Sequence, residues 1–308
     1  MERQQPVQTE QTQALPVEGL IHLGVVYFVW GSTFLGIRVA VGPGGGFPPF
    51  TLVSSRLLLA GTLLLLWALV RGRRILPTRS ELVVLAASGV LLWGLGNGLV
   101  VWAEQRVASG LAALMIGSIP LWTALLDSLV DRRLPERRAM IWLLVGFGGV
   151  TLLAAPLLQS GIRADLLSLL ALFTSTITWA LGVILQRRRP VEVGMVVSSA
   201  YQHLAGGIWM AAAAWIFHEP VPTPSTAAWL AWLYLVVFGG LAFTSYVQTL
   251  QLLPINLVMT HAYVNPAIAV FLGWVVLDEV LTAWTLSGMV LILIGVWGVF
   301  RRRGPAGH

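Results

Sequence analysis

Long apolar runs dominate the chain, and each run is close to the length that crosses a lipid bilayer. A helix needs about 20 apolar residues to span ~30 Å of hydrocarbon. Ten such runs occur, at residues 19–40, 50–70, 81–103, 108–129, 138–158, 164–185, 193–217, 227–250, 256–277 and 282–300. Because the runs are continuous and do not alternate over short segments, they predict helices and argue against a membrane β-barrel.

Short turn-forming segments separate the runs. Residues 42–49 are rich in glycine and proline, and residues 218–224 contain three prolines, so neither segment can continue a helix. The other connections are also short, which leaves no room for an inserted soluble domain. The pattern therefore predicts an all-α integral membrane protein with ten transmembrane helices.

The two halves of the chain resemble each other at an offset of about 145 residues. Five matches occur in the same order: Val53–Ser55 with Val197–Ser199, Leu59–Gly61 with Leu204–Gly206, Pro120 with Pro266, Gly149-Val150 with Gly295-Val296, and Trp30 with Trp179. Five helices per copy is an odd number, so the second copy would enter the membrane from the opposite side. We expect two inverted five-helix repeats, at residues 19–160 and 161–303, with a disordered cytoplasmic tail at 1–18 and another cytoplasmic tail at 304–308. The alternative is chance similarity between apolar helices of low complexity.

Charge is scarce, and its placement predicts the orientation. The chain is 57% hydrophobic and 10% charged, whereas a soluble domain carries roughly 25% charged residues. The basic residues, which are all arginines, cluster after even-numbered runs: Arg71, Arg73, Arg74 and Arg79; Arg132, Arg133, Arg137 and Arg138; Arg187, Arg188 and Arg189; and Arg301, Arg302 and Arg303. The positive-inside rule then places both termini on the cytoplasmic side of a bacterial plasma (inner) membrane.

The composition also excludes some partners and sites. Clusters of arginines at helix ends do not form a groove-sized basic patch, so no nucleic-acid partner is expected. The chain has no cysteine, which excludes disulfides and thiolate metal sites.

Several short motifs resemble a known transporter family. They are Trp30–Phe34, Pro48-Pro49, Arg56, Gly96–Gly98, Ala103–Gln105, Ser109–Ala113, Ala262–Pro266, and Glu279 followed by Leu281-Thr282. In this order they resemble the EamA domain of the drug/metabolite transporter (DMT) superfamily, in particular its YedA-like exporters. The resemblance implies a ten-helix inverted-repeat fold and export of metabolites, amino acids or toxic compounds, often coupled to protons. The first-half counterpart of Glu279 is Arg133, so any role of that glutamate is not duplicated.

Two prolines mark a candidate central site. Pro120 and Pro266 lie mid-way along matching helices, where each removes one backbone hydrogen bond, freeing the carbonyls of Ile116 and Ala262. Interrupted helices at matching places in two halves indicate a binding site near the bilayer midplane. A plain packing kink is the alternative.

Charged residues inside or at the ends of spans are candidate gating or coupling groups. Arg38, Arg56 and Glu104 all fall in the predicted periplasmic half, and we expect Glu104 to pair with Arg38 or Arg56 and close the outer side of the pathway. Snorkelling to headgroups, or a static pair, is the alternative. Asp127 lies one helical turn before Asp131, Arg132 and Arg133. We expect it to make a structural contact with these arginines, and a proton-carrying role is the alternative.

Polar and aromatic residues within the spans are candidate substrate-binding groups. Beside Pro120 and Pro266 they are Trp30, Ser32, Thr33, Asn97, Ser118, Trp122, Trp179, Gln248, His261, Tyr263 and Asn265. His261 is one turn before Asn265, and its imidazole could relay protons, although a hydrogen-bonded core histidine is the commoner outcome. Small hydroxyls more often join membrane helices, and many tryptophans form interfacial belts. Together these residues suggest a cavity with few fixed charges, which suits an amphipathic or zwitterionic solute.

A secondary transporter is the function that this pattern favours. It would export small amino-acid-like, amphipathic or drug-like metabolites by alternating access, driven by protons or exchange, as a monomer or weak dimer in the lipid bilayer. An intramembrane enzyme would need a nucleophile with a base, or a metal site. The sequence has no HExxH, GxSxG or nucleotide-binding loop, so neither an enzyme nor a bound cofactor is expected. A channel or passive facilitator remains the alternative.

Overall fold

The structure is a computed structural model that describes residues 16–133, 137–159, 163–253, 255–258 and 260–300. Throughout these ranges the regular structure is helical. The helices are α1 (Val17–Val41), α2 (Pro49–Val70), α3 (Arg79–Gly89), η1 (Val90–Asn97), α4 (Gly98–Ala103), α5 (Ser109–Ile116), α6 (Ile119–Val130), α7 (Arg137–Gln159), α8 (Arg163–Arg188), α9 (Met195–Ile216), α10 (Thr226–Leu252), α11 (Ile255–Val258), α12 (His261–Leu277) and α13 (Ala283–Phe300). Most of the predicted tails, residues 1–15 and 304–308, and the arginines 301–303 lie outside the described residues.

The apolar runs of the sequence coincide with the helices to within three residues at each end. In the described part of the chain, five stretches are long and apolar enough to cross a membrane: Val17–Val41, Pro49–Val70, Arg79–Ala103, Ser109–Val130 and Leu166–Arg188. Large apolar side chains also cover the outside of the bundle, as at Val70 (86% exposed) and Trp215 (80%). Such a surface fits a lipid environment and not water.

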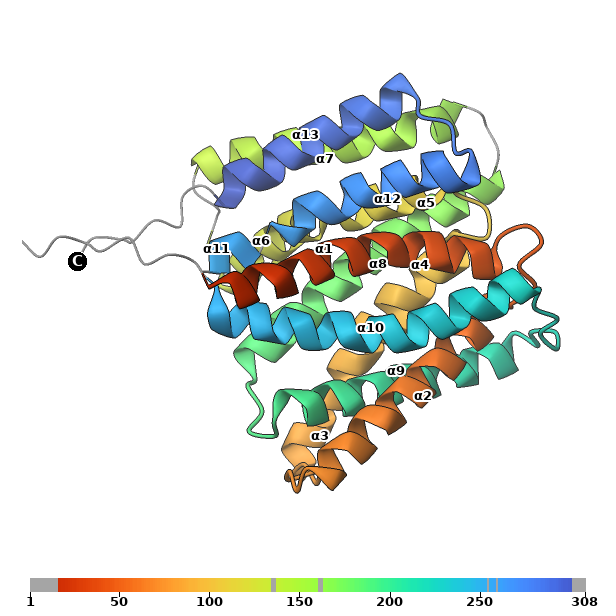
Figure 1. Ribbon diagram of the computed structural model, residues 1–308. Coiled ribbons are helices and arrows are strands. Elements are labelled where there is room, and N and C mark those ends of the chain that lie inside the picture. Colours follow the sequence, from red (N-terminus) through yellow and green to blue (C-terminus); the bar gives the residue numbers. More distant parts are fainter. Residues whose placement is uncertain (1–15, 134–136, 160–162, 254, 259, 301–308) are drawn as a thin grey trace, which may run out of the picture.

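The helices pack in a recurring pattern (Figure 1). α1 contacts α10 and α12, and α8 contacts η1 and α6 in the same way. α2 packs on α9, α7 on α13, and α5 on α12. Counting η1 and α4 with α3, α6 with α5, and α11 with α12 gives ten helical units. When every unit is replaced by the unit five places along, the contacts named above are exchanged in pairs or are unchanged. α1 and α8, which correspond in this scheme, run in opposite directions.

The chain has two helix breaks in the passes that contain Pro120 and Pro266, of which the first falls beside Pro120 as expected and the second does not fall at Pro266. The first break separates Ile116 from Ile119, and Pro120 then lies in the first turn of α6, where its missing N–H costs nothing. The second break comes before His261, whereas Pro266 lies inside α12. The two interruptions are therefore not at matching positions. The first break does lie close to Pro266, since a Cβ added at Gly117 would be 2.9 Å from Cγ of Pro266.

A π-helical segment, η1, was not anticipated from the sequence. It extends the third pass between α3 and α4, and packs against α8 and α9. Within an unbroken apolar run, a change from 3.6 residues per turn to the wider π geometry leaves no mark in the pattern of polar positions. π-helical segments occur frequently at functional sites.

Two apolar cores meet at the end of this third pass. Val100 and Ala103 belong to a core with α5, α6, α7, α8, α12 and α13, while Val101 belongs to a second core with α1, α2, α9 and α10. α4 is therefore packed on opposite faces, which fixes the turn that follows it.

Glycines allow α7 and α13 to approach closely. A Cβ added at Gly149 would be 2.7 Å from the carbonyl oxygen of Gly288 and 2.8 Å from the backbone nitrogen of Ile292. One at Gly295 would be 2.5 Å from Cα of Gly146. Only glycine fits at such a crossing.

Replacing Gly149 with alanine should therefore destabilise the protein by about 1–3 kcal/mol, because the helices must separate. Gly148 is the matched control on the same helix, since an added Cβ there meets nothing within 4 Å. Gly148→Ala should be neutral or stabilising through helix propensity. Thermal unfolding of the two purified variants in detergent measures the difference, and equal midpoints would contradict this description of the interface.

Candidate functional site

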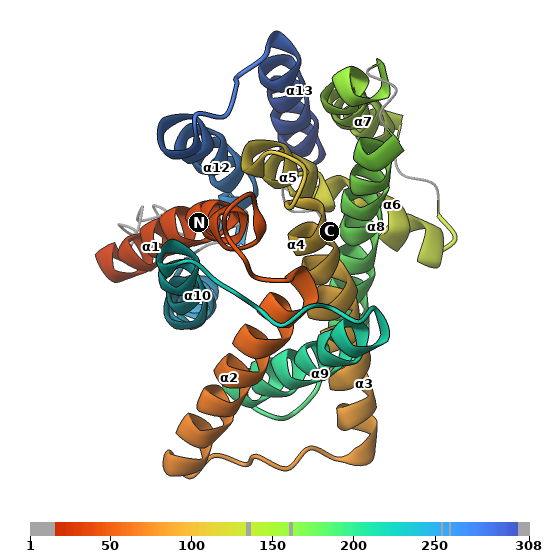
Figure 2. The same cartoon turned by 90° about the vertical axis from the view of Figure 1, so that its right-hand side faces the viewer.

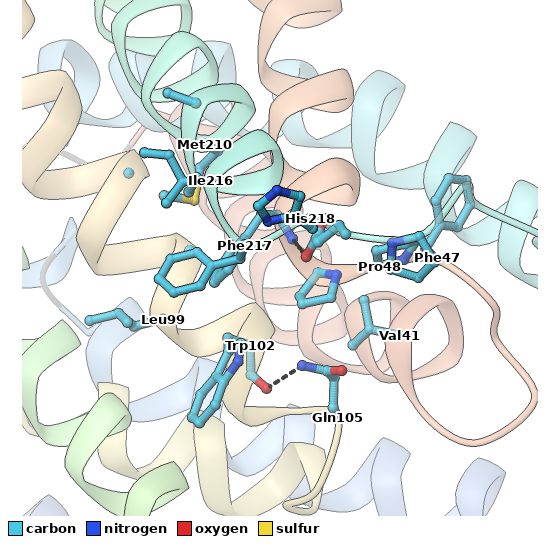
Figure 3. A pocket seen from close by; sticks show the side chains of 18 of the residues that line it. Val41, Phe47, Pro48, Leu99, Trp102, Gln105, Met210, Ile216, Phe217 and His218 are labelled. Carbon is cyan, nitrogen blue, oxygen red and sulfur yellow. Dashed lines mark hydrogen bonds between the residues drawn. The ribbon is translucent and has the colours of Figure 1, made fainter.

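A cavity of about 1210 Å³ opens at one end of the bundle. Figure 2 views the bundle from this end, and Figure 3 shows the residues around the cavity. The walls come from η1 and α4, from the end of α9, and from residues 46–50 and 216–223. Most of the lining is apolar or aromatic, including Phe47, Phe50, Leu99, Trp102, Trp209 and Phe217. The arginines that follow α2, α6 and α8 lie at the opposite end of the bundle.

The rim of the cavity is built by two proline-rich turns that bind each other. The backbone nitrogens of Thr223 and Ser225 donate to the carbonyls of Gly46 (3.1 Å) and Gly45 (3.0 Å). Gly46 has a φ of +85°, and a Cβ there would be 2.2 Å from the oxygen of Thr223. Glycine is required at this point by both conformation and space.

A carboxylate fastens the rim to the start of α2. Glu219 accepts hydrogen bonds from the backbone nitrogens of Phe50 (2.9 Å) and Thr51 (2.7 Å), and from the Thr51 hydroxyl (2.7 Å). The first backbone N–H groups of a helix have no partner within the helix, and the helix dipole favours a negative charge there. Glu219, just after α9, therefore holds the start of α2 in place.

Two further carboxylates do the same elsewhere. Glu279, between α12 and α13, accepts from the backbone nitrogens of Ser109 (2.7 Å) and Gly110 (3.1 Å) at the start of α5. Glu81, in the first turn of α3, accepts from the nitrogens of Glu192 (2.8 Å) and Val193 (3.2 Å) just before α9. We call Glu219, Glu279 and Glu81 the carboxylate clasps. Each of them joins the first half of the chain to the second.

The polar lining of the cavity comes from two sides, the turn after α4 and the proline-rich turn after α9. The guanidinium of Arg106 lies over the ring of Trp102, 5.1 Å from its centroid, a cation–π arrangement. Gln105 donates through Nε2 to the carbonyl of Trp102 at 3.0 Å (Figure 3). His218 and Glu219 contribute the polar groups on the other side. The cavity thus offers flat apolar walls with a few charged groups.

A buried carboxyl group, that of Glu104, lies in the turn after α4. Glu104 is fully buried, and neither of its carboxylate oxygens has a hydrogen-bond partner. Arg38 donates instead to the backbone carbonyl of Glu104, and Arg56 donates to the side-chain oxygen of Asn97. The ion pair predicted between Glu104 and one of these arginines is therefore not formed in this conformation, because both arginines have other acceptors.

Comparison with known proteins gives the family. The family model of the EamA-like transporters matches the chain twice, at residues 18–155 and 166–301. The chain belongs to the EamA-like transporter family. It is 32% identical over 287 residues to the uncharacterized inner membrane transporter YedA of Escherichia coli K12, covering 92% of this chain and 90% of YedA. It is also 26% identical to the uncharacterized transporter YdfC of Bacillus subtilis 168, covering 91% and 90% of the two chains.

A solved structure supports the fold of this EamA-like transporter. A protein of known crystal structure superposes with a TM-score of 0.63 at 20% identity, covering 92% of this chain and 97% of the other. The identity is low, so the match shows the fold alone. The family and the apolar helices together make the chain a bacterial inner membrane transporter.

Three of the predicted substrate-binding residues of this EamA-like transporter gather around α1. Trp30 on α1 has ring contacts with Tyr246 of α10 and His261 of α12, at centroid distances of 5.0 and 5.3 Å. His261 also contacts the carbonyl of Val258 at 2.8 Å through Nδ1. The amide of buried Asn265, turned with its nitrogen toward them, donates to the carbonyls of Tyr27 and His261 at 3.2 Å. The side chain of Tyr263 lies outside the described part of the structure.

The hydroxyl candidates bond mainly to their own helices. Ser32 donates to the carbonyl of Phe28 (2.6 Å) and contacts the Tyr234 hydroxyl (2.5 Å). Thr33 donates to Trp30 (2.6 Å), and Ser118, at the break before α6, donates to Met115 (2.6 Å). These contacts match the alternative role of small polar residues in joining and satisfying membrane helices.

The remaining aromatic and amide candidates are dispersed. Trp179 of α8 contacts Trp93 of η1 with a centroid distance of 5.6 Å. Trp122 packs against Phe147 (4.5 Å) and Phe173 (4.9 Å), between α7 and α8. Gln248 is half-buried on α10. These residues therefore do not share one site.

Asp127 has different partners from those predicted. It forms ion pairs with Arg187 and Arg188 of α8, the latter at 2.8 Å, and Arg188 also reaches Asp131 at 2.5 Å. The expected contact with Arg132 and Arg133 is replaced because the end of α6 packs against α8. An interhelical position cannot be inferred from neighbours in the sequence.

The cavity itself was missed by sequence reasoning. Of the predicted substrate-binding residues whose side chains are described, none lines it. The lining residues Trp102, Gln105 and Arg106 lie on either side of Glu104, which is a predicted gating residue. The sequence does contain one indication of the cavity. The turns at 42–49 and 218–224 and the end of the third run are all predicted on the side of the membrane away from the arginine clusters.

Removing the Glu219 clasp should loosen the rim of the cavity. Glu219→Ala leaves two backbone donors of α2 without an acceptor, which should lower the unfolding free energy by about 1.5 kcal/mol at this partly exposed position. Glu192→Ala is the control, because the Glu192 side chain is 90% exposed with one weak contact to Arg74 at 3.7 Å. Denaturant titration in detergent measures both. A Glu219→Ala protein as stable as Glu192→Ala would show that the clasp contributes nothing.

Proposed function

We propose that this chain exports small amphipathic or amino-acid-like solutes across the inner membrane by alternating access. In this proposal ten helical passes form two inverted repeats, and the cavity beside Trp102 is the solute site open to the outer face. The observation that carries the proposal is the aromatic cavity of about 1210 Å³ at the end of the bundle opposite the arginine clusters.

The packing of the helices supports the inverted repeat. Contacts of α1 with α10 and α12 have counterparts in contacts of α8 with η1 and α6, and the corresponding helices α1 and α8 run in opposite directions (Figure 1). Two halves built alike but inverted can exchange conformations, which yields two states of similar energy open to opposite faces. The repeat would therefore supply the two states between which alternating access takes place.

The positions of the arginines support the orientation. Arg71, Arg73 and Arg74 follow α2, and Arg187 to Arg189 end α8 or follow it, all at one end of the bundle. Under the positive-inside rule this end is cytoplasmic, so the cavity opens to the periplasm.

Cysteine labelling tests this orientation directly, because the chain contains no cysteine of its own. Val221→Cys lies in a turn at the cavity end, where the valine is 84% exposed, and Ser80→Cys lies at the arginine end, where the serine is exposed. A membrane-impermeant maleimide added to spheroplasts should label Val221→Cys and spare Ser80→Cys, with the reverse in inverted vesicles. The opposite labelling pattern would contradict the proposed orientation.

The lining of the cavity supports the class of solute. Trp102, Phe217 and Trp209 provide flat apolar surfaces, while Arg106 and Glu219 provide one charge of each sign near the mouth. An apolar body would pack on the rings, and a carboxylate would be attracted to the guanidinium of Arg106. A phosphate ester, with two negative charges, would meet only one cation in the described lining.

The gate that fits this proposal is the turn after α4. With the cavity open to the outside, the carboxylate of Glu104 is separate from Arg38 and Arg56. We expect the pair to form when the outer side closes.

Transport into proteoliposomes tests the function and the site together. Three aromatic probes differ in charge: phenylalanine is zwitterionic, benzoate anionic and ethidium cationic. Exchange of labelled phenylalanine against internal phenylalanine should occur in the wild type and fall at least about tenfold in Trp102→Ala, which removes one of the flat aromatic walls of the cavity. A passive channel would show no counterflow.

Trp215→Ala is the matched control, because Trp215 lies near the same end of the bundle but is 80% exposed on its outside. It should exchange phenylalanine at the wild-type rate. Equal rates in Trp102→Ala and the wild type would remove the cavity from the transport pathway, and exchange of benzoate or ethidium alone would overturn the proposed solute class.

A further inference from the structure

Glu104 is a carboxyl group that the structure buries without satisfying it. Its residue is 0% exposed, and both carboxylate oxygens lack a hydrogen-bond partner. An unpaired, ionised carboxylate in such surroundings has a very high desolvation cost, whereas the protonated acid is neutral and tolerates burial far better. The environment therefore favours a bound proton on Glu104 in this conformation.

Among the described residues, three charged groups act on Glu104, and each of them already has a hydrogen-bond partner. They are Arg38 from α1, Arg56 from α2 and Glu279 from the turn between α12 and α13. Arg38 donates to the backbone carbonyl of Glu104, and Arg56 to Asn97, while Nε of Arg56 has no partner. Glu279 is bound to the start of α5. Neither arginine now contacts the carboxyl group of Glu104. Either of them could bind the carboxylate once its proton has left.

The position of Glu104 couples it to the cavity. Trp102 at the end of α4 and Gln105 and Arg106 in the turn line the cavity, while the side chain of Glu104 is buried, with its backbone carbonyl bound by Arg38 of α1. The backbone of this turn is closed by bonds from Glu104 N to Val100 O (2.9 Å) and from Arg106 N to Ala103 O (2.9 Å). A rotation of the turn would therefore move the cavity lining and the carboxyl group together.

We propose that Glu104 is the proton-binding group of the transport cycle. While the cavity is open to the outside, Glu104 holds a proton taken from the outer solution. When the outer side closes, the carboxyl group ionises, its proton leaves toward the side that is then open, and Arg38 or Arg56 binds the carboxylate in its place. One proton would enter for each solute exported. The direction of proton movement in this inference rests on the proposed function, whereas the protonation of Glu104 does not depend on it.

Infrared difference spectroscopy tests the bound proton without any solute. In purified wild-type protein near neutral pH, we expect a carbonyl stretching band of a protonated carboxylic acid, with a shift in heavy water. The band should be lost in Glu104→Gln and retained in Glu192→Gln, the control with a 90% exposed carboxylate. A wild type without the band, or a Glu104→Gln protein that retains it, would overturn the inference. Glu104→Asp should shift the band without removing it, so the assignment can be decided even if Glu104→Gln does not fold.

Transport of phenylalanine tests the coupling. In Glu104→Gln proteoliposomes we expect accumulation of phenylalanine driven by a pH gradient to fall at least about tenfold, because the variant has no carboxyl group at this position to carry the proton. Glu192→Gln should accumulate phenylalanine at the wild-type level. Gradient-driven accumulation at the wild-type level in Glu104→Gln would overturn the inference. If the wild type itself does not exchange phenylalanine, the proposed function fails for this probe, and the infrared assignment still decides whether Glu104 binds a proton.

Discussion

The satisfaction of backbone donors at helix starts is the constraint from which much of this structure follows. Each helix begins with N–H groups that have no partner within the helix, and hydrocarbon offers none. At α2 and α5, and just before α9, the acceptors are the carboxylates of Glu219, Glu279 and Glu81. All three reach across from the other half of the chain. The same bonds that satisfy the backbone thus hold the two halves together.

The clasps also explain where charge is found in so apolar a chain. A carboxylate that accepts two or three hydrogen bonds from backbone N–H groups has these groups in place of water. Glu104 differs from the three clasps, because its carboxyl group is buried and accepts no hydrogen bond. The contrast between Glu279, whose carboxylate is fully engaged, and its neighbour Glu104 separates a structural carboxylate from one suited to changing its protonation state.

Much of the fold could be predicted from the sequence, because span length and turn residues are local properties. The helix bounds follow from where apolar runs meet Gly-Pro and Arg-rich segments, and the structure agrees to within three residues. The π-helical segment Val90–Asn97 and the break before His261 could not be predicted, since neither changes the pattern of apolar residues. The partners of Asp127 and Glu219 lie on distant segments, so they required the tertiary arrangement. The cavity was missed for the same reason, as its walls come from four separate stretches.

The two ends of the bundle are not equivalent, although the packing pattern is repeated. Glu219, at the cavity end, and Glu81, at the arginine end, hold corresponding helices. Glu279 has no such counterpart, because Arg133 occupies the matching position of the first half and a guanidinium cannot accept a hydrogen bond. The cavity end therefore carries one clasp more among the described residues, and a charged hydrogen bond contributes about 1.5–3 kcal/mol. Such a difference would make two inverted conformations unequal in energy, so a cycle between them needs an added interaction that favours the other state. A carboxylate and two arginines beside the cavity are placed to supply it.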